Sequence, residues 1–207
     1  MADAEVQNYV LFLLQIHGDA LMATKEFKQA GVLYYQVCKV YNRWKVNNRI
    51  MDVVEPCDAT AADLTREVCE FGVDDYIRTK ASYAESIMNM GDIQQAIQKF
   101  ENAKFSIENE IVYENPMIYV NICNQLANCY LLLPEKDLDK ALENFELSLC
   151  TISKIESEKA ADRCEGTDQI SPLIVAKICL NIAIIRSQLG DLQEAVYMHE
   201  KSLMYKS

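Results

Sequence analysis

The sequence repeats one short pattern four times, each time after a stretch with apolar residues at helical spacing. The four segments end on an alanine and read KEFKQA (25–30), GDIQQA (91–96), EKDLDKA (135–141) and GDLQEA (190–195). We interpret each segment as the turn between the two helices of a hairpin. A single helical hairpin cannot bury its apolar face alone, so neighbouring hairpins must stack around a continuous core. The sequence therefore predicts an all-α solenoid of helical hairpins.

The helical periodicity predicts four hairpins within a single domain that covers residues 1–207. We expect a loop near 46–59, because Asn47, Asn48 and Pro56 interrupt the periodic pattern there. A short extra helix should begin near Thr60 and end before Gly72, so that loop and helix together fill residues 46–72. The four hairpins are expected near 5–42, 74–110, 117–160 and 171–207.

The composition favours a folded chain in a reducing compartment. Half of the residues are hydrophobic and only four are proline, which argues against disorder. No apolar run approaches the roughly 18 residues of a membrane span, and the acidic start does not resemble a signal peptide. The eight cysteines form no C-x-x-C pair, and only two histidines are present. We therefore expect buried free thiols, no metal site and a cytoplasmic location.

The net charge of −11 is concentrated in one segment. Residues 52–76 contain eight acidic side chains against a single arginine, which gives −7 there. An acidic chain is repelled by nucleic acid and by anionic lipid, and it attracts basic partners. A solvated surface explains much of this charge equally well. The charge predicts no nucleic-acid binding, no membrane insertion and, at most, a preference for basic protein ligands.

The spacing of small, alanine and aromatic residues resembles that of tetratricopeptide-repeat (TPR) proteins. That family pairs a small residue in the first helix with an alanine that opens the second helix and an aromatic residue one turn later. The small residues here are Gly18, Ala84, Ala127 and Ala183, and the opening alanines are Ala30, Ala96, Ala141 and Ala195. The aromatic place is taken by Tyr34, Phe100 and Phe145, whereas His199 departs from it.

The repeats depart from the standard length of this family. The opening alanines are 66, 45 and 54 residues apart, whereas the TPR unit has 34 residues. These spacings predict longer helices and inserted loops, which would resemble the extended repeats of kinesin light chains. No polar capping helix follows the fourth repeat, so Leu203 and Met204 should stay exposed or pack on a partner. Whether the chain is one part of a longer protein stays open.

The resemblance implies a right-handed solenoid of about four TPR-like repeats whose first helices line a concave groove. The groove side chains would then bind a peptide, with asparagine amides that grip the ligand backbone through both donor and acceptor atoms. The same amides could instead be ordinary solvated or packed residues. The residues that the resemblance places in the groove are Asp19, Arg78, Glu85, Asn121, Asn124, Gln125, Asn128, Lys177 and Asn181.

Two functions fit this sequence. The first is a protein–protein interaction adaptor or scaffold that binds a peptide segment in the groove. The second is a structural subunit that self-associates or joins a larger assembly through its open C-terminal end. We find no phosphate loop, nucleophile elbow or H-E-x-x-H motif, so no catalytic residue, enzyme activity or cofactor is predicted. The partner, the pathway and the oligomeric state stay open.

Overall fold

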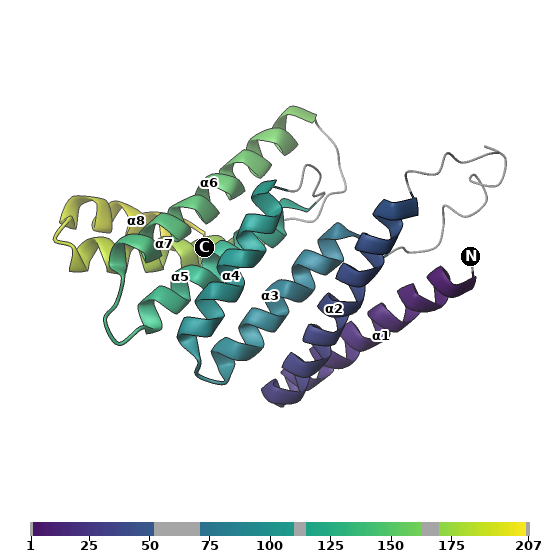
Figure 1. The fold of residues 1–207 in the computed structure, drawn as a ribbon. Coiled ribbons are helices and arrows are strands. Elements are labelled where there is room, and N and C mark those ends of the chain that lie inside the picture. Colours follow the sequence, from purple (N-terminus) through teal and green to yellow (C-terminus); the bar gives the residue numbers. More distant parts are fainter. Residues whose placement is uncertain (1, 52–70, 110–114, 163–169, 206–207) are drawn as a thin grey trace. The chain divides into compact units, whose positions relative to one another are not determined.

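A computed structural model describes residues 2–51, 71–109, 115–162 and 170–205 of this chain (Figure 1). These residues form eight α-helices and no β-strand, as the all-α prediction requires. Within the described residues, no helix combines the length and the apolar character that a bilayer span needs. The chain divides into two compact units, Met1–Gly91 and Asp92–Ser207, and each unit is described by itself.

The first unit contains three helices, of which the middle one packs against both others. These are α1 (Ala2–Ala23), α2 (Phe27–Met51) and α3 (Val73–Asn89). Aromatic side chains fill one end of the core, where the rings of Tyr41 and Tyr76 stack with centroids 4.3 Å apart. The ring of Phe71 makes a T-shaped contact with Phe12 and a tilted contact with Tyr41, with centroids 5.4 Å and 5.7 Å apart. Burial of these rings supplies much of the apolar stabilisation of the unit.

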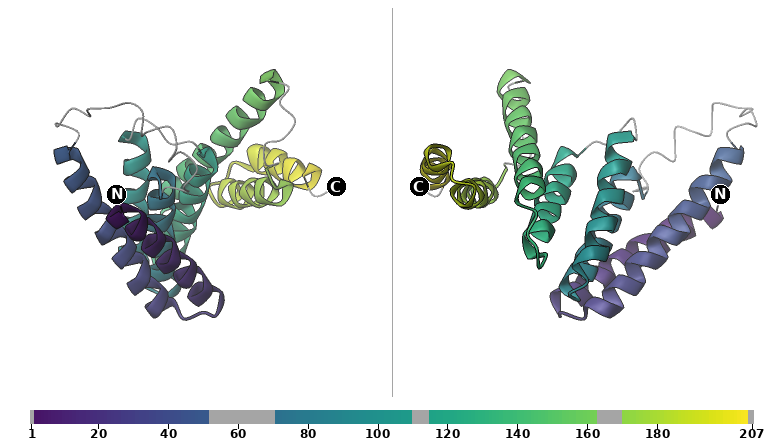
Figure 2. Two further views of the ribbon diagram at one scale, coloured as in Figure 1. Left: turned by 90° about the vertical axis from the view of Figure 1, so that its right-hand side faces the viewer. Right: turned by 60° about the vertical axis from the view of Figure 1, so that its left-hand side comes forward.

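The second unit is a series of five helices in which each packs against the next in sequence. Figure 2 shows the last two lying side by side as a hairpin. α5 and α7 contribute many buried residues to the core, and these residues lie on two sides of each helix. The five helices are α4 (Ile93–Asn109), α5 (Pro116–Leu132), α6 (Leu138–Asp162), α7 (Pro172–Gln188) and α8 (Leu192–Met204).

The turns confirm that three of the four repeated segments are equivalent. Gly91 and Gly190 have φ values of 92° and 86°, in the left-handed region that glycine adopts without steric cost. Lys25, which takes the turn position of the first segment, has φ of 64° and is the non-glycine residue with positive φ in the described chain. The segment at Pro134 differs, because Leu133 before it is extended, with φ of −61° and ψ of 147°.

The spacing that suggests a hairpin repeat also agrees with the observed packing. All four small residues and all four opening alanines are buried, and so are Tyr34, Phe100 and Phe145. His199, which departs from the aromatic pattern, is exposed. Gly18 lies so close to Tyr34 that a Cβ at this position would be 2.6 Å from the ring atom Cε1. The small residue is therefore required by close contact between two helices.

One of the expected boundaries is wrong. The loop was expected from residue 46, but α2 continues to Met51. Asparagines 47 and 48 lower helix propensity by only about 0.7 kcal/mol each, which does not end a helix that already has six turns. The last residue of α6 is Asp162, within two residues of the expected end near 160. The short helix expected from Thr60 lies outside the described residues, as does most of the acidic segment 52–76.

Candidate functional site

In the first unit, two of the predicted groove residues lie in one local environment. The hydroxyl of Tyr34 on α2 donates to Oδ1 of Asp19 on α1 at 2.6 Å. Burial, and then the hydrogen bond to Asp19, raise the pKa of the Tyr34 phenol. Burial, and then the negative charge of Asp19, raise the pKa of Glu85 on α3. The structure therefore brings Asp19 and Glu85 close enough to repel each other, and a cation placed beside both would relieve that repulsion.

Arg78 lies on the same helix as Glu85 and two turns before it, so both project from one side of α3. Its guanidinium is exposed and lies 3.9 Å from the carboxylate of Asp75, which makes a weak ion pair. Arg78 therefore lies on the same face of α3 as Glu85. Asp19 instead makes its short hydrogen bond with Tyr34 on α2.

In the second unit, the predicted amides form a strip along α5. Asn121 is exposed, and Asn124, Gln125 and Asn128 are half-buried at successive turns of one face. Nδ2 of Asn128 donates to Oε1 of Gln125 at 3.2 Å, which fixes the two amides relative to each other. The other faces of α5 carry fully buried apolar residues, among them Ile122, Leu126 and Ala127. The helix thus has one polar, uncharged and partly exposed face.

The uncovered face of α7 combines polar and apolar side chains. Lys177 is exposed and Asn181, one turn later, is half-buried. Leu173 and Ile184 lie on the same face and are 54% and 44% exposed. Sequence reasoning missed these two residues because an apolar residue in a strongly apolar helix is expected to be buried. The signal was their helical spacing with Lys177 and Asn181.

The seven predicted residues therefore form two local groups. Asp19, Arg78 and Glu85 belong to the first unit, where they form a mainly acidic face. The second group lies on α5 and α7, both of which pack against α6, and it consists of Asn124, Asn128, Lys177 and Asn181.

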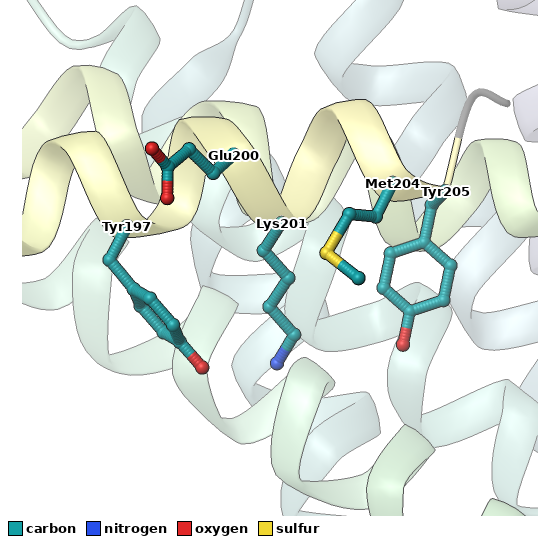
Figure 3. A pocket seen from close by; sticks show the side chains of 5 residues that line it. All are labelled: Tyr197, Glu200, Lys201, Met204 and Tyr205. Carbon is teal, nitrogen blue, oxygen red and sulfur yellow. The ribbon is translucent and has the colours of Figure 1, made fainter.

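A cavity of about 390 Å³ lies along α8 in the second unit. It is lined by Tyr197, Glu200, Lys201, Met204 and Tyr205, and Figure 3 shows both tyrosines, the lysine and the methionine projecting from one side of the helix. Burial raises the pKa of Tyr205, and the charges of Glu156 and Cys179 raise it further. Leu203 and Met204, on the same helix, are 63% and 76% exposed. The cavity offers aromatic and apolar contact area beside one lysine and one glutamate.

A second hollow of about 320 Å³ lies between α4, α5 and α6, and several of its polar lining side chains contact one another. The hydroxyl of Tyr130 donates to Oε1 of Glu101 at 2.7 Å, and Nζ of Lys104 donates to Oδ1 of Asn144 at 3.1 Å. Nζ of Lys140 lies 5.3 Å from the centre of the Tyr130 ring. These contacts join neighbouring helices, so we interpret this hollow as part of the helix packing.

The buried thiols are poor nucleophiles. Burial raises the pKa of Cys129 to about 12 and is the main cause that raises the pKa of Cys123 to about 11. Both sulfurs are therefore protonated near neutral pH. Cys150, by contrast, is exposed, which departs from the expectation of buried thiols. In the described part of the chain, no three His, Cys, Asp or Glu side chains are grouped as metal ligands.

Comparisons with known proteins support the helical fold, but they do not assign the chain to a family. No protein-family model matches the sequence, and no curated protein matches it either. Among solved structures, the chain is similar to BtubC (BKLC) from P. vanneervenii, with a TM-score of 0.51 and 14% sequence identity. The similarity covers 97% of this chain and 81% of that chain. At this identity the likeness concerns the helical architecture alone.

Proposed function

We propose that this chain is a protein-binding module, an adaptor or scaffold, that holds an extended segment of a partner against the uncovered faces of α5 and α7. The observation that carries the proposal is the uncharged amide strip Asn121, Asn124, Gln125 and Asn128 on an otherwise apolar helix. An amide offers both a donor and an acceptor, so a row of amides can satisfy a ligand backbone along its length.

The uncovered face of α7 supplies the remaining features of a peptide site. Leu173 and Ile184 offer apolar area, and Lys177 and Asn181 lie between them as polar contacts. Interfaces of this mixed kind bind through a few apolar anchors and gain register from their hydrogen bonds. Because both faces belong to helices whose other sides are fully buried, they are pre-organised and lose little entropy on binding.

The net charge of the chain favours a basic ligand. The chain carries a net charge of −11. A segment with lysine or arginine residues would approach faster and lose this advantage as salt is added. The ligand of the proposed module is therefore an extended peptide with some basic residues.

The test is selection of peptides from a random library by the full chain, followed by titration of the selected peptides against two variants. Asn128→Ala combined with Asn181→Ala should weaken binding at least about tenfold, which corresponds to roughly 1.4 kcal/mol. The matched control is Gln94→Ala with Gln98→Ala, which removes two exposed amides from α4. The control should bind as the unmodified chain does, and both variants should keep the helical circular dichroism.

Equal affinity of the two double variants would contradict the role of these asparagines. If the library yields no peptide at all, the whole proposal for α5 and α7 is wrong.

A second candidate function is a structural subunit that docks through α8. The exposed Leu203 and Met204 and the cavity beside them favour this possibility. Leu203→Gln with Met204→Gln should then release the chain from its assembly and leave selected peptides bound. A chain that stays in its assembly after both changes would contradict docking through α8.

A further inference from the structure

Helix α1 is apolar on two opposite sides, but the first unit covers only one of them. The covered side contains Leu11, Gln15 and Gly18, which are buried against the rest of the unit. The opposite side carries five large apolar residues that are 44–65% exposed: Val6, Tyr9, Val10, Leu13 and Ile16. A helix that is apolar all round is typical of an element covered on both sides. Scattered exposed apolar residues are common, but a continuous strip of this kind indicates an interaction surface.

The spacing of this strip is that of a coiled-coil seam. Val6, Tyr9, Leu13 and Ile16 follow at intervals of three, four and three residues, so they alternate between the a and d positions of a heptad. The same frame continues through Ala20 and Ala23, which are also exposed. The seam therefore runs for 18 residues, about 27 Å of helix, and carries no charge. We call these six residues the α1 seam.

We infer that the α1 seam binds the α1 seam of a second copy of this chain, with the two helices antiparallel. In an antiparallel coiled coil, a positions of one helix face d positions of the other. This register places Leu13 opposite Ile16 at the centre, Tyr9 opposite Ala20, and Val6 opposite Ala23. By two-fold symmetry each of these layers occurs twice.

The order of side-chain sizes favours a second copy over an unrelated helix. Large residues occupy the first two thirds of the seam and alanines occupy the last third. An antiparallel copy puts each alanine against a Tyr9 or Val6, so every layer contains at least one large side chain. A parallel copy would face Tyr9 with Tyr9 and Ala20 with Ala20, which opens a gap at one end. The seam is thus self-complementary in one orientation.

The expected contact is weak and strengthens with salt. Stable interfaces bury about 800 Å² per partner, more than one strip of six residues provides, so a dissociation constant in the micromolar range is expected. Each copy carries −11, and the resulting repulsion falls as the ionic strength rises. Apolar association between like-charged copies should therefore be tighter at about 0.5 M salt than at about 0.05 M.

Analytical ultracentrifugation of the full chain, from about 1 to 500 μM, tests this contact. The unmodified chain should change from monomer to dimer within this range. Leu13→Gln with Ile16→Gln should weaken the dimer at least tenfold, without changing the melting temperature, because both side chains are exposed in the monomer. Two controls remove comparably exposed apolar residues elsewhere: Val32→Gln on α2, and Leu203→Gln with Met204→Gln on α8.

Both controls should dimerise as the unmodified chain does. A chain that stays monomeric throughout the range overturns the inference, and so does a dimer that only the α8 variant abolishes. Because Leu13 and Ile16 are not among the proposed peptide contacts, the α1 variant should keep the affinity for selected peptides. Failure of the peptide proposal would leave this test unaffected.

Photo-crosslinking determines the orientation. Benzoylphenylalanine in place of Tyr9 should crosslink to the partner copy near Ala20, and mass spectrometry of the crosslinked peptides reads the site. Crosslinks to the region around residue 9 would indicate the parallel pairing, and crosslinks to α8 would indicate a different interface. Either of these results overturns the antiparallel seam.

Discussion

Gly18, Tyr34 and Asp19 show how one small residue positions a polar group. The missing side chain of Gly18 lets the Tyr34 ring lie against α1, with Cε1 2.6 Å from where a Cβ would be. From that position the Tyr34 hydroxyl reaches Asp19 at 2.6 Å. The packing and the hydrogen bond therefore depend on each other at this crossing of α1 and α2.

Gly18→Ala should destabilise the chain by about 1–3 kcal/mol, because the added methyl group overpacks the contact with Tyr34. The gain in helix propensity offsets at most about 1 kcal/mol of this loss. Urea denaturation followed by circular dichroism measures the difference. The double variant with Tyr34→Leu should show strong coupling between the two sites, and a neutral Gly18→Ala would contradict the close contact.

Glu85 should make the stability of the first unit depend on pH. Its pKa is raised in the folded state, so the folded chain binds more protons than the unfolded chain. Stability from this group is therefore highest in acid and falls as the pH rises from about 4.5, the ordinary value, through the raised native pKa. Glu85→Gln should be more stable than the unmodified chain at pH 7 and equal to it near pH 4.

Thermal melts of both chains at several pH values check this sign. Glu135→Gln, at an exposed turn position, is the matched control. A Glu85→Gln variant that is less stable than the unmodified chain at pH 7 would contradict this sign.

At the scale of the helical elements, the chain uses two kinds of turn. Three hairpin turns place a residue in the left-handed region, and two of these residues are Gly91 and Gly190. The third, Lys25, adopts φ of 64° against the preference of a residue with a Cβ. The turn at Pro134 avoids the left-handed region, because two extra residues give an extended path between α5 and α6.

Lys25→Gly should stabilise the chain by about 0.5–1 kcal/mol. Release of the left-handed strain is worth about 1–2 kcal/mol, and the greater freedom of glycine in the unfolded chain removes part of that gain. Lys25→Ala retains a Cβ and should give no comparable gain, whereas Gly190→Ala should cost about 1 kcal/mol. Urea denaturation of the three variants measures these differences, and a destabilised Lys25→Gly would be inconsistent with the observed backbone.

At the scale of the whole molecule, burial is distributed unevenly among the helices. Among the α1 residues whose burial the structure describes, few are buried, and these include Leu11, Gln15 and Gly18. In contrast, α7 has seven buried residues in 17 positions: Val175, Ala176, Ile178, Cys179, Ile182, Ala183 and Ile185. Local opening exposes much more apolar surface from α7 than from α1, so the two helices should differ in local stability.

Hydrogen exchange should therefore be slowest in α5 and α7 and at least about tenfold faster in α1 at low protein concentration. Mass spectrometry of peptic fragments measures this difference. At concentrations where the α1 seam is paired, exchange in α1 should slow while α5 and α7 stay unchanged. Uniform exchange along the chain would contradict the uneven burial.

The sequence by itself determined the features that depend on local or periodic patterns. Glycine and alanine spacing identified the hairpins and the small buried positions, because close helix crossings admit few residue types. Helix ends were predicted less well, and α2 passed its expected end because asparagine weakens a helix without terminating it. The roles of the seven predicted groove residues stay predictions, although their positions on one face of each helix follow from the 3.6-residue period.

Only the tertiary structure decided which faces meet and which stay uncovered. Asp19, Tyr34 and Glu85 come from three helices, so their proximity depends on packing that no local pattern encodes. The sequence also did not predict that the strip on α1, and Leu173 and Ile184 on α7, are exposed. Apolar periodicity indicates only that a helix face tends to avoid water. Whether another part of the same chain covers that face depends on where every other helix lies.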